Sequence, residues 1–392
     1  MGRDRSRWAL LASAVLTVAL TVAGPAPVVS GTSTSAAEDR PLLELRAVPG
    51  SDVRSLDVPL TDSLDRARGG AVTTGPIGTS GFSLVGFTWR GAWDPHLQVR
   101  TLSRRGWSRW QAVPRLHDVP DTGTEGIAGQ RASQPWWVGR STGIDVRVTA
   151  GVRDLTMALI DPGTHPTDRS ARRAANVGKP NAEEPDAAPR PYIRSRKSWG
   201  AKERWRNGGP YYNRTIKQVH VHHTATGNDY RGKDVPALLR AIYRYHTHNL
   251  GWSDIGYNFL VDRFGRNWQG RAGGSARPVR GAHTLGFNDT STGVAVLGTY
   301  TDKSPNEKVL KALVHLAAWK LDRYHRKPKG KVTVYSRGSD KYPAGTKVRL
   351  RVIDGHRDTN DTECPGGLLY DELTAIRLRT QNRVDRFDPP AS

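Results

Sequence analysis

Two different patterns of hydrophobic and polar residues divide this chain. Between residues 38 and 162, short apolar segments rich in β-branched residues are separated by Gly, Pro and Asp. Val146, Val148 and Ala150 alternate with Arg147 and Thr149, as along a half-buried strand. Because no helical period accompanies these segments, the pattern predicts an all-β, sandwich-like domain, whose role the sequence does not indicate. We expect strands at 82–89, 96–102, 144–150 and 155–160.

From residue 191 to residue 385 the pattern alternates between strands and helices. Apolar runs at 218–222, 257–261, 293–297 and 351–353 are typical of strands. Asp234 is expected just before one helix, and Ser304, Pro305 and Glu307 predict the cap and first turn of a second helix. A third helix is expected at 369–380. This order predicts an α/β domain in which helices cover a sheet.

The two ends of the chain and the segment between the domains have compositions of their own. Arg3, Arg5 and Arg7 precede a short apolar run, which predicts a signal peptide over 1–37 that is cleaved near Ala36 or Ala37. A membrane anchor is the alternative, but the run is short and no second apolar span follows it. We therefore expect a secreted or cell-wall protein without a stable membrane span after cleavage. Residues 163–190 are typical of a linker, and 386–392 form a C-terminal tail.

The chain is strongly basic, with a formal net charge of +22. Charge of this size bears on partners rather than on fold. Export and the absence of a nucleic-acid-binding motif disfavour nucleic acid as the partner. Anionic wall polymers, or peptides that carry carboxylates, fit an exported protein better. The alternative is that the excess charge serves only solubility.

One cysteine and two histidines are the candidates for metal chemistry. Cys364 is the only cysteine in the chain, so it cannot form an intramolecular disulfide. His222 and His356 each sit at the end of an expected apolar strand, where a sheet presents side chains at its rim. Two imidazoles and a thiolate suit Zn²⁺ with one position left open for water. Most single histidines are structural, so the spacing alone leaves this interpretation open.

Several motifs in the same region resemble a known family. Their order and spacing are similar to those of peptidoglycan recognition proteins and type-2 N-acetylmuramoyl-L-alanine amidases, over about half of the chain. The resemblance implies a mixed sheet with helices packed on it and a Zn²⁺ site in a long cleft. The matching stretches are 195–201, 221–225, 251–259, 281–284, 286–288, 355–357 and 364–365.

The resemblance also implies roles for residues around the metal. His222, His356 and Cys364 match the three Zn²⁺ ligands, whereas His223 is expected to point to the opposite face of its strand. Tyr257 matches a tyrosine beside the metal-bound water. Thr362 matches a position occupied by lysine or threonine, and either side chain can donate to an oxyanion. The implied reaction is hydrolysis of the lactyl–L-Ala amide of peptidoglycan by water that the metal activates.

The resemblance further implies that four positions recognise the peptide stem. Gly251, Trp252 and Arg271 match the positions that discriminate diaminopimelate from lysine at the third stem residue. An arginine can hold the extra carboxylate of diaminopimelate in a bidentate pair, which favours diaminopimelate-type stems. His283 matches a position that contacts the stem. The alternatives are that Arg271 is a solvated charge and that His283 is structural.

The motifs leave two main classes of function open. The first is a secreted zinc amidase, and the second is a module that binds peptidoglycan without cleaving it. Non-catalytic relatives lose a metal ligand, commonly the cysteine, whereas this chain keeps Cys364 together with both histidines. A third interpretation gives the main role to the β domain, which would target wall polymers.

Overall fold

The computed structural model describes residues 42–60, 72–91, 95–148, 152–170 and 187–387. Residues Pro41–Ser392 form one compact unit, separate from Met1–Arg40. The expected signal peptide and its cleavage site lie outside the described residues. Among the described residues, none of the helices has the length and apolar character needed to cross a bilayer.

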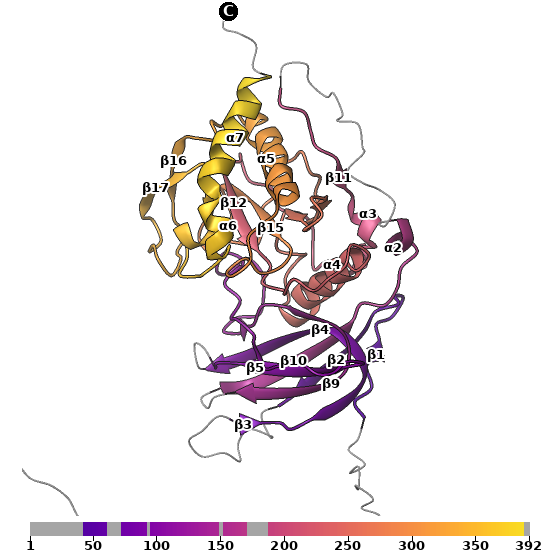
Figure 1. Cartoon of the computed structure of the whole chain (residues 1–392). Coiled ribbons are helices and arrows are strands. Elements are labelled where there is room, and N and C mark those ends of the chain that lie inside the picture. The colour runs from indigo at the N-terminus through magenta and orange to yellow at the C-terminus, as the bar shows by residue number, and fades with distance from the viewer. Residues whose placement is uncertain (1–41, 61–71, 92–94, 149–151, 171–186, 388–392) are drawn as a thin grey trace, which may run out of the picture. The chain divides into compact units, whose positions relative to one another are not determined.

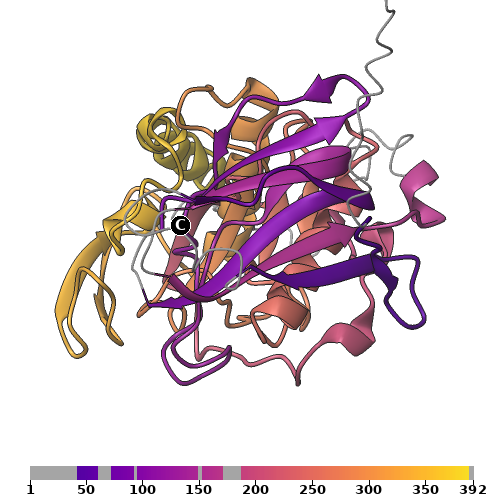
Figure 2. The ribbon, with the colours of Figure 1, turned by 90° about the horizontal axis from the view of Figure 1, so that it is seen from below.

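The N-terminal part of the described chain is all-β, as the sequence predicts. Its strands pair antiparallel in one ten-stranded sheet, with the main order β1-β2-β10-β4-β9-β5-β6, and Figure 2 shows the longest of them running side by side. The strands are β1 (Arg46–Ala47), β2 (Arg54–Pro59), β3 (Val72–Thr73), β4 (Ile77–Gly91), β5 (Gln98–Ser103), β6 (Gly106–Trp107), β7 (Gln111–Ala112), β8 (Arg131–Ala132), β9 (Trp136–Val148) and β10 (Val152–Asp161).

The C-terminal part contains a mixed sheet covered by helices, which confirms the expected α/β fold (Figure 1). The six-stranded sheet has the order β11-β14-β13-β15-β12-β18, and β16 pairs with β17 separately. The strands are β11 (Ile193–Arg194), β12 (Gln218–His223), β13 (Phe259–Val261), β14 (Asn267–Gln269), β15 (Ser291–Val296), β16 (Lys331–Tyr335), β17 (Lys347–Arg351) and β18 (Ile353–Gly355). The helices are α2 (Thr167–Ser170), α3 (Arg196–Trp199), α4 (Val235–Arg244), α5 (Glu307–Asp322), α6 (Gly367–Asp371) and α7 (Leu373–Asp385), and short turns lie at η1 (Glu203–Trp205), η2 (Tyr245–Asn249) and η3 (His356–Asp358).

Two details of the expected helices differ in the structure. The cap predicted at Ser304 is wrong, because helix α5 begins at Glu307 and Asn306 is its N-cap. The Asn306 side chain accepts hydrogen bonds from the backbone N–H groups of Lys308 and Val309, which are two of the donors left free at a helix start. The expected third helix is divided into α6 and α7.

Alternate residues of the central strand β15 face two different apolar clusters. Val294 and Val296 pack into a cluster with helices α5 and α7. Ala295 and Leu297 belong to a second cluster, which includes helix α4 and also residues of the β sheet such as Leu84 and Ile160. The two expected domains therefore share a hydrophobic core on this side of the mixed sheet.

Tyr245, directly after helix α4, is central to the contact between the two sheets. Its side chain is fully buried, and its hydroxyl lies 2.8 Å from the carbonyl oxygen of Phe87 and 3.1 Å from that of Ser133. A Cβ at Gly86 would lie 2.3 Å from the tyrosine ring, so only glycine permits this approach. The strand β4 backbone is thus fitted to one aromatic side chain of the α/β part.

We expect Tyr245→Phe to lower the free energy of unfolding by about 1–3 kcal/mol, because it removes a buried donor that lies within hydrogen-bond distance of two carbonyl oxygens. Chemical denaturation followed by tryptophan fluorescence measures the change. Tyr335→Phe is the matched control, because Tyr335 is 60% exposed and should tolerate the same loss. Equal stability of the two variants would contradict the importance of the Tyr245 hydroxyl.

Candidate metal centre and adjoining cleft

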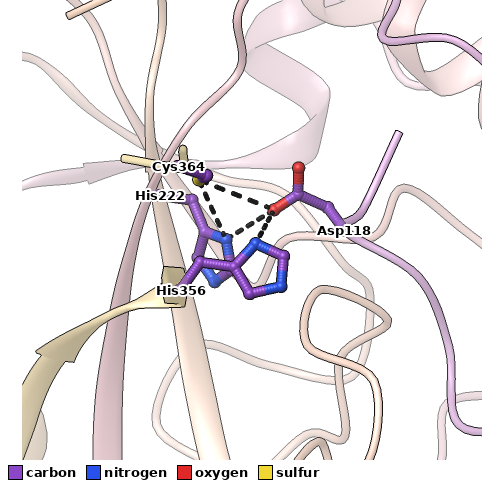
Figure 3. Close-up of side chains that lie close together, drawn as sticks. All are labelled: Asp118, His222, His356 and Cys364. Carbon is purple, nitrogen blue, oxygen red and sulfur yellow. Dashed lines mark hydrogen bonds and ion pairs between the residues drawn. The ribbon is translucent and has the colours of Figure 1, made fainter. Parts of the chain in front are cut away.

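Four side chains from distant parts of the sequence converge on one point (Figure 3). Strands β12 and β18 run parallel, with Val221 opposite Gly355, so the residues that follow this pair, His222 and His356, lie at the same edge of the sheet. Cys364 joins them from the loop after η3, and Asp118 comes from the β domain. One ligand atom from each of the four lies within 4.8 Å of the others.

The donor atoms of these four side chains lie close to one another. His222 Nδ1 lies 2.5 Å and His356 Nδ1 lies 3.1 Å from Asp118 Oδ1. Cys364 Sγ lies 3.7 Å from His222 Nδ1 and 4.0 Å from Asp118 Oδ1. All four residues are buried. Two nitrogens, one sulfur and one oxygen form a donor set suited to a tetrahedral metal ion such as Zn²⁺.

Burial and mutual charge set the protonation states of three members of the group. Burial lowers the pKa of His222 to about 4, so its imidazole is neutral near pH 7. Burial alone would raise the pKa of Asp118, but His356 and His222 lower it well below its usual value. Burial and the Asp118 charge raise the pKa of the Cys364 thiol well above its usual value. A metal would therefore displace a proton from the thiol as it binds.

A third histidine orients the first ligand. His222 Nε2 lies 3.1 Å from His283 Nδ1, so a His222 that binds a metal through Nδ1 can donate its Nε2 proton to His283. His283 is fully buried, and a Cβ at Gly281 or Gly293 would lie 2.3 or 2.4 Å from its ring. His283 is thus fixed behind His222, and its contact with a peptide stem stays a prediction.

Tyr257 and Thr362 each lie next to one of the candidate ligands. The ring centroids of Tyr257 and His222 are 5.8 Å apart, and burial and the Asp118 charge raise the pKa of the Tyr257 phenol well above its usual value. The phenol therefore remains a hydrogen-bond donor. Thr362 Oγ1 accepts a hydrogen bond from the backbone N–H of Cys364 at 3.2 Å, which leaves the threonine hydroxyl proton available to another acceptor. His223, by contrast, accepts through Nδ1 from the Tyr300 N–H.

The three residues expected to select the stem type lie beneath a loop of the β domain, residues 113–130 between β7 and β8. Arg271 forms a bidentate pair with Glu125, at 2.9 Å from Oε1 and 3.0 Å from Oε2. A Cβ at Gly251 would lie 3.1 Å from the Ile127 side chain, and one at Gly126 would lie 3.4 Å from Trp252. Arg271 is only 4% exposed, so the interpretation of a solvated charge does not apply to this conformation.

Sequence reasoning missed Asp118 and Glu125, because each meets a partner more than one hundred residues away. Asp118 is 104 residues from His222, and Glu125 is 146 residues from Arg271. A signal was nevertheless present. Asp118, Asp121 and Glu125 place three carboxylates within eight residues of a chain that has 59 basic and 37 acidic side chains.

We expect Cys364→Ser to lower the affinity for Zn²⁺ well beyond tenfold, because even loss of a group that only orients a ligand costs about 10- to 100-fold. The substitution should also abolish proton release on Zn²⁺ binding near pH 7, since serine does not ionise there. Titration calorimetry in buffers of different ionisation enthalpy measures both effects. His325→Asn, at an exposed histidine, is the control and should change neither. Unchanged proton release in the serine variant would remove the thiol from the site.

Both parts of the chain match known families. Residues 212–367 match the N-acetylmuramoyl-L-alanine amidase family, and residues 46–189 match the Rv3811 N-terminal galactose-binding domain-like family. Peptidoglycan-recognition protein SC2 of Drosophila melanogaster is 33% identical over 153 residues, which cover 39% of this chain and 70% of that protein. Peptidoglycan-recognition protein SA of the same organism is 36% identical over 128 residues, which cover 33% of this chain and 60% of that protein.

Among solved structures, Drosophila PGRP-LB is 27% identical, covering 47% of this chain and 93% of that chain with a TM-score of 0.37. The sequence matches span the strands and loops that carry His222, His356 and Cys364. The chain belongs to the family of peptidoglycan-recognition proteins and N-acetylmuramoyl-L-alanine amidases, and its amidase domain follows an all-β, galactose-binding-like domain.

Proposed function

We propose that this protein is a secreted, zinc-dependent N-acetylmuramoyl-L-alanine amidase that cleaves the lactyl–L-Ala amide of peptidoglycan. The observation that carries the proposal is the convergence of His222, His356 and Cys364 on one point beside Tyr257. A protein that only recognises peptidoglycan has no need for three buried ligands and a phenol around a single point. Non-catalytic recognition is the second candidate, because the family includes recognition proteins as well as amidases.

Each polar group of the site has a part in the proposed reaction. A bound Zn²⁺ would supply Lewis-acid chemistry, which activates water and polarises the scissile carbonyl. The protonated Tyr257 phenol would donate a hydrogen bond to the carbonyl oxygen as negative charge develops there. The Thr362 hydroxyl proton is available for the same purpose. His283 would hold His222 in the orientation and tautomer needed for binding through Nδ1.

Arg271 supports a preference for diaminopimelate-type stems. Its guanidinium already binds a carboxylate in a bidentate pair, which is the geometry expected for the additional carboxylate of diaminopimelate. Lysine-type stems have no such group. We propose that peptidoglycan stems with diaminopimelate are the favoured substrates and that anionic wall polymers are further partners of the basic chain.

The test of the reaction is mass spectrometry of products from defined muropeptides, with zinc-loaded protein and with a chelator. It should use the intact chain and its Asp118→Asn variant, because Asp118 lies among the ligands. We expect free stem peptides with a new N-terminal alanine, and none after chelation. Muropeptide binding without cleavage by both zinc-loaded proteins would instead establish the recognition function.

We expect Tyr257→Phe to lower kcat by about 100- to 1,000-fold, the usual cost of removing one oxyanion donor. Muropeptide affinity should change much less, because the hydroxyl acts on charge that develops in the transition state. Steady-state kinetics and calorimetry separate the two effects. A proportional loss of affinity would assign Tyr257 to substrate binding instead.

The stem preference can be tested in a background that frees Arg271 from its acidic partner. We expect Glu125→Gln/Arg271→Gln to lose more affinity for diaminopimelate muropeptides than for lysine muropeptides, relative to Glu125→Gln alone. Calorimetry with both ligands measures the difference. Equal losses for the two stem types would contradict the role of Arg271 in selection.

A further inference from the structure

The loop 113–130 contacts both the metal ligand group and the residues expected to select the stem type. Asp118 lies among the metal ligands, and Glu125 binds Arg271. Between them, Asp121 Oδ1 accepts hydrogen bonds from the Gly286 N–H at 2.8 Å and from Asn288 Nδ2 at 3.1 Å. The loop therefore extends from the ligand group to the arginine.

Asp118 would supply a fourth ligand to a metal bound at this site. A catalytic zinc site keeps three protein ligands and one open position, whereas a closed structural site has four. Asp118 Oδ1 lies 2.5 Å from His222 Nδ1 and 3.1 Å from His356 Nδ1, so the carboxylate would take the position that a catalytic zinc site leaves open. The other carboxylate oxygen accepts a hydrogen bond from Gln134 Nε2 at 2.8 Å, so the β domain itself fixes Asp118 in this position.

Glu125 reproduces the charge of the proposed ligand at the other end of the cleft. Besides its pair with Arg271, its Oε2 accepts hydrogen bonds from the backbone N–H and the hydroxyl of Ser253, each at 2.6 Å. The carboxylate is thus bound by four donors, as a stem carboxylate would have to be. Gly126 and Ile127 then pack against Trp252 and Gly251, the other two positions expected to contact the stem.

We propose that the loop 113–130 is an autoinhibitory plug, in which Asp118 closes the metal position and Glu125 occupies the subsite for the stem carboxylate. The site has to open before a muropeptide can bind, so the apparent affinity equals the intrinsic affinity multiplied by the fraction of open molecules. The assignment of the Glu125 subsite rests on the proposed substrate, whereas closure of the metal position does not.

The alternative is that Asp118 belongs to the working site as a general base. Such a role needs one carboxylate near the metal but gives no reason for Glu125, Gly126 and Ile127 to fill the stem subsite. Two separate substitutions distinguish the possibilities in the full chain. Asp118→Asn keeps an acceptor for Gln134 but weakens the ligand, and Glu125→Gln removes the charge that pairs with Arg271.

The first measurement tests the metal position without any turnover. Co²⁺-loaded wild-type protein and Asp118→Asn are titrated with acetohydroxamate, a chelating anion whose binding changes the visible spectrum of Co²⁺. We expect Asp118→Asn to bind at least about tenfold more tightly than wild type. Asp154→Asn, at an exposed aspartate of the β domain, is the matched control and should behave as wild type. Equal affinity of wild type and Asp118→Asn would overturn closure by Asp118.

The second measurement tests the plug at the arginine. Calorimetry with a diaminopimelate muropeptide should give about tenfold or greater gain in affinity for Glu125→Gln, because a buried charge pair that competes with the ligand is lost. Glu44→Gln, at an exposed glutamate, should have the wild-type affinity. An unchanged affinity of Glu125→Gln would overturn the occupied subsite.

Activity then separates this proposal from the proposed function. If Asp118→Asn cleaves muropeptides faster than wild type does, the plug is supported. If wild type cleaves them and Asp118→Asn does not, Asp118 is the general base and the plug is overturned. If Asp118→Asn binds acetohydroxamate more tightly and Glu125→Gln binds the muropeptide more tightly, but neither variant nor wild type cleaves it, the plug is supported and the proposed amidase activity is contradicted.

Discussion

The burial of one ionised carboxylate governs the arrangement of this protein. Asp118 is fully buried, and a charge removed from water needs compensation by its neighbours. The β domain provides one donor, Gln134, whereas His222, His356 and Cys364 belong to the amidase domain. The Asp118 side chain is consequently satisfied only while the two domains remain in contact, and the shared apolar cluster around Tyr245 holds them so.

The same constraint applies at Arg271, the residue proposed to bind the stem carboxylate. Arg271 is almost completely buried and requires an anion, which Glu125 supplies within the chain. The Asp118 carboxylate of the β domain thus lies among potential metal ligands of the amidase domain. The Glu125 carboxylate, also of the β domain, lies opposite the buried charge of Arg271. In the proposed amidase, the carboxylates of the β domain would inhibit through the same groups that attract an anionic substrate.

The sequence predicted those features that depend on local patterns. His222 and His356 could be located because they lie at the carboxyl ends of short apolar strands, and parallel strands bring these ends to one edge. The cap of helix α5 was misplaced because Ser304-Pro305 resembles a helix start, although Asn306 has the side chain that accepts from the first free N–H groups. Asp118 and Glu125 belong to a loop, and no local period records which surface a loop will cover. Their place depends on how Gly86 and Tyr245 fit together, which only the assembled sheets determine.

A metal ion held by Asp118 and by the ligands of the amidase domain would also link the two domains to each other. Residues 118 and 222 are separated by 104 positions, so joining them removes much conformational entropy from the unfolded chain, as a disulfide over the same span would. With a single cysteine, the chain cannot make such a disulfide. The thiol of Cys364 would then stabilise the protein through the metal, in a way that does not depend on the redox conditions that form disulfides.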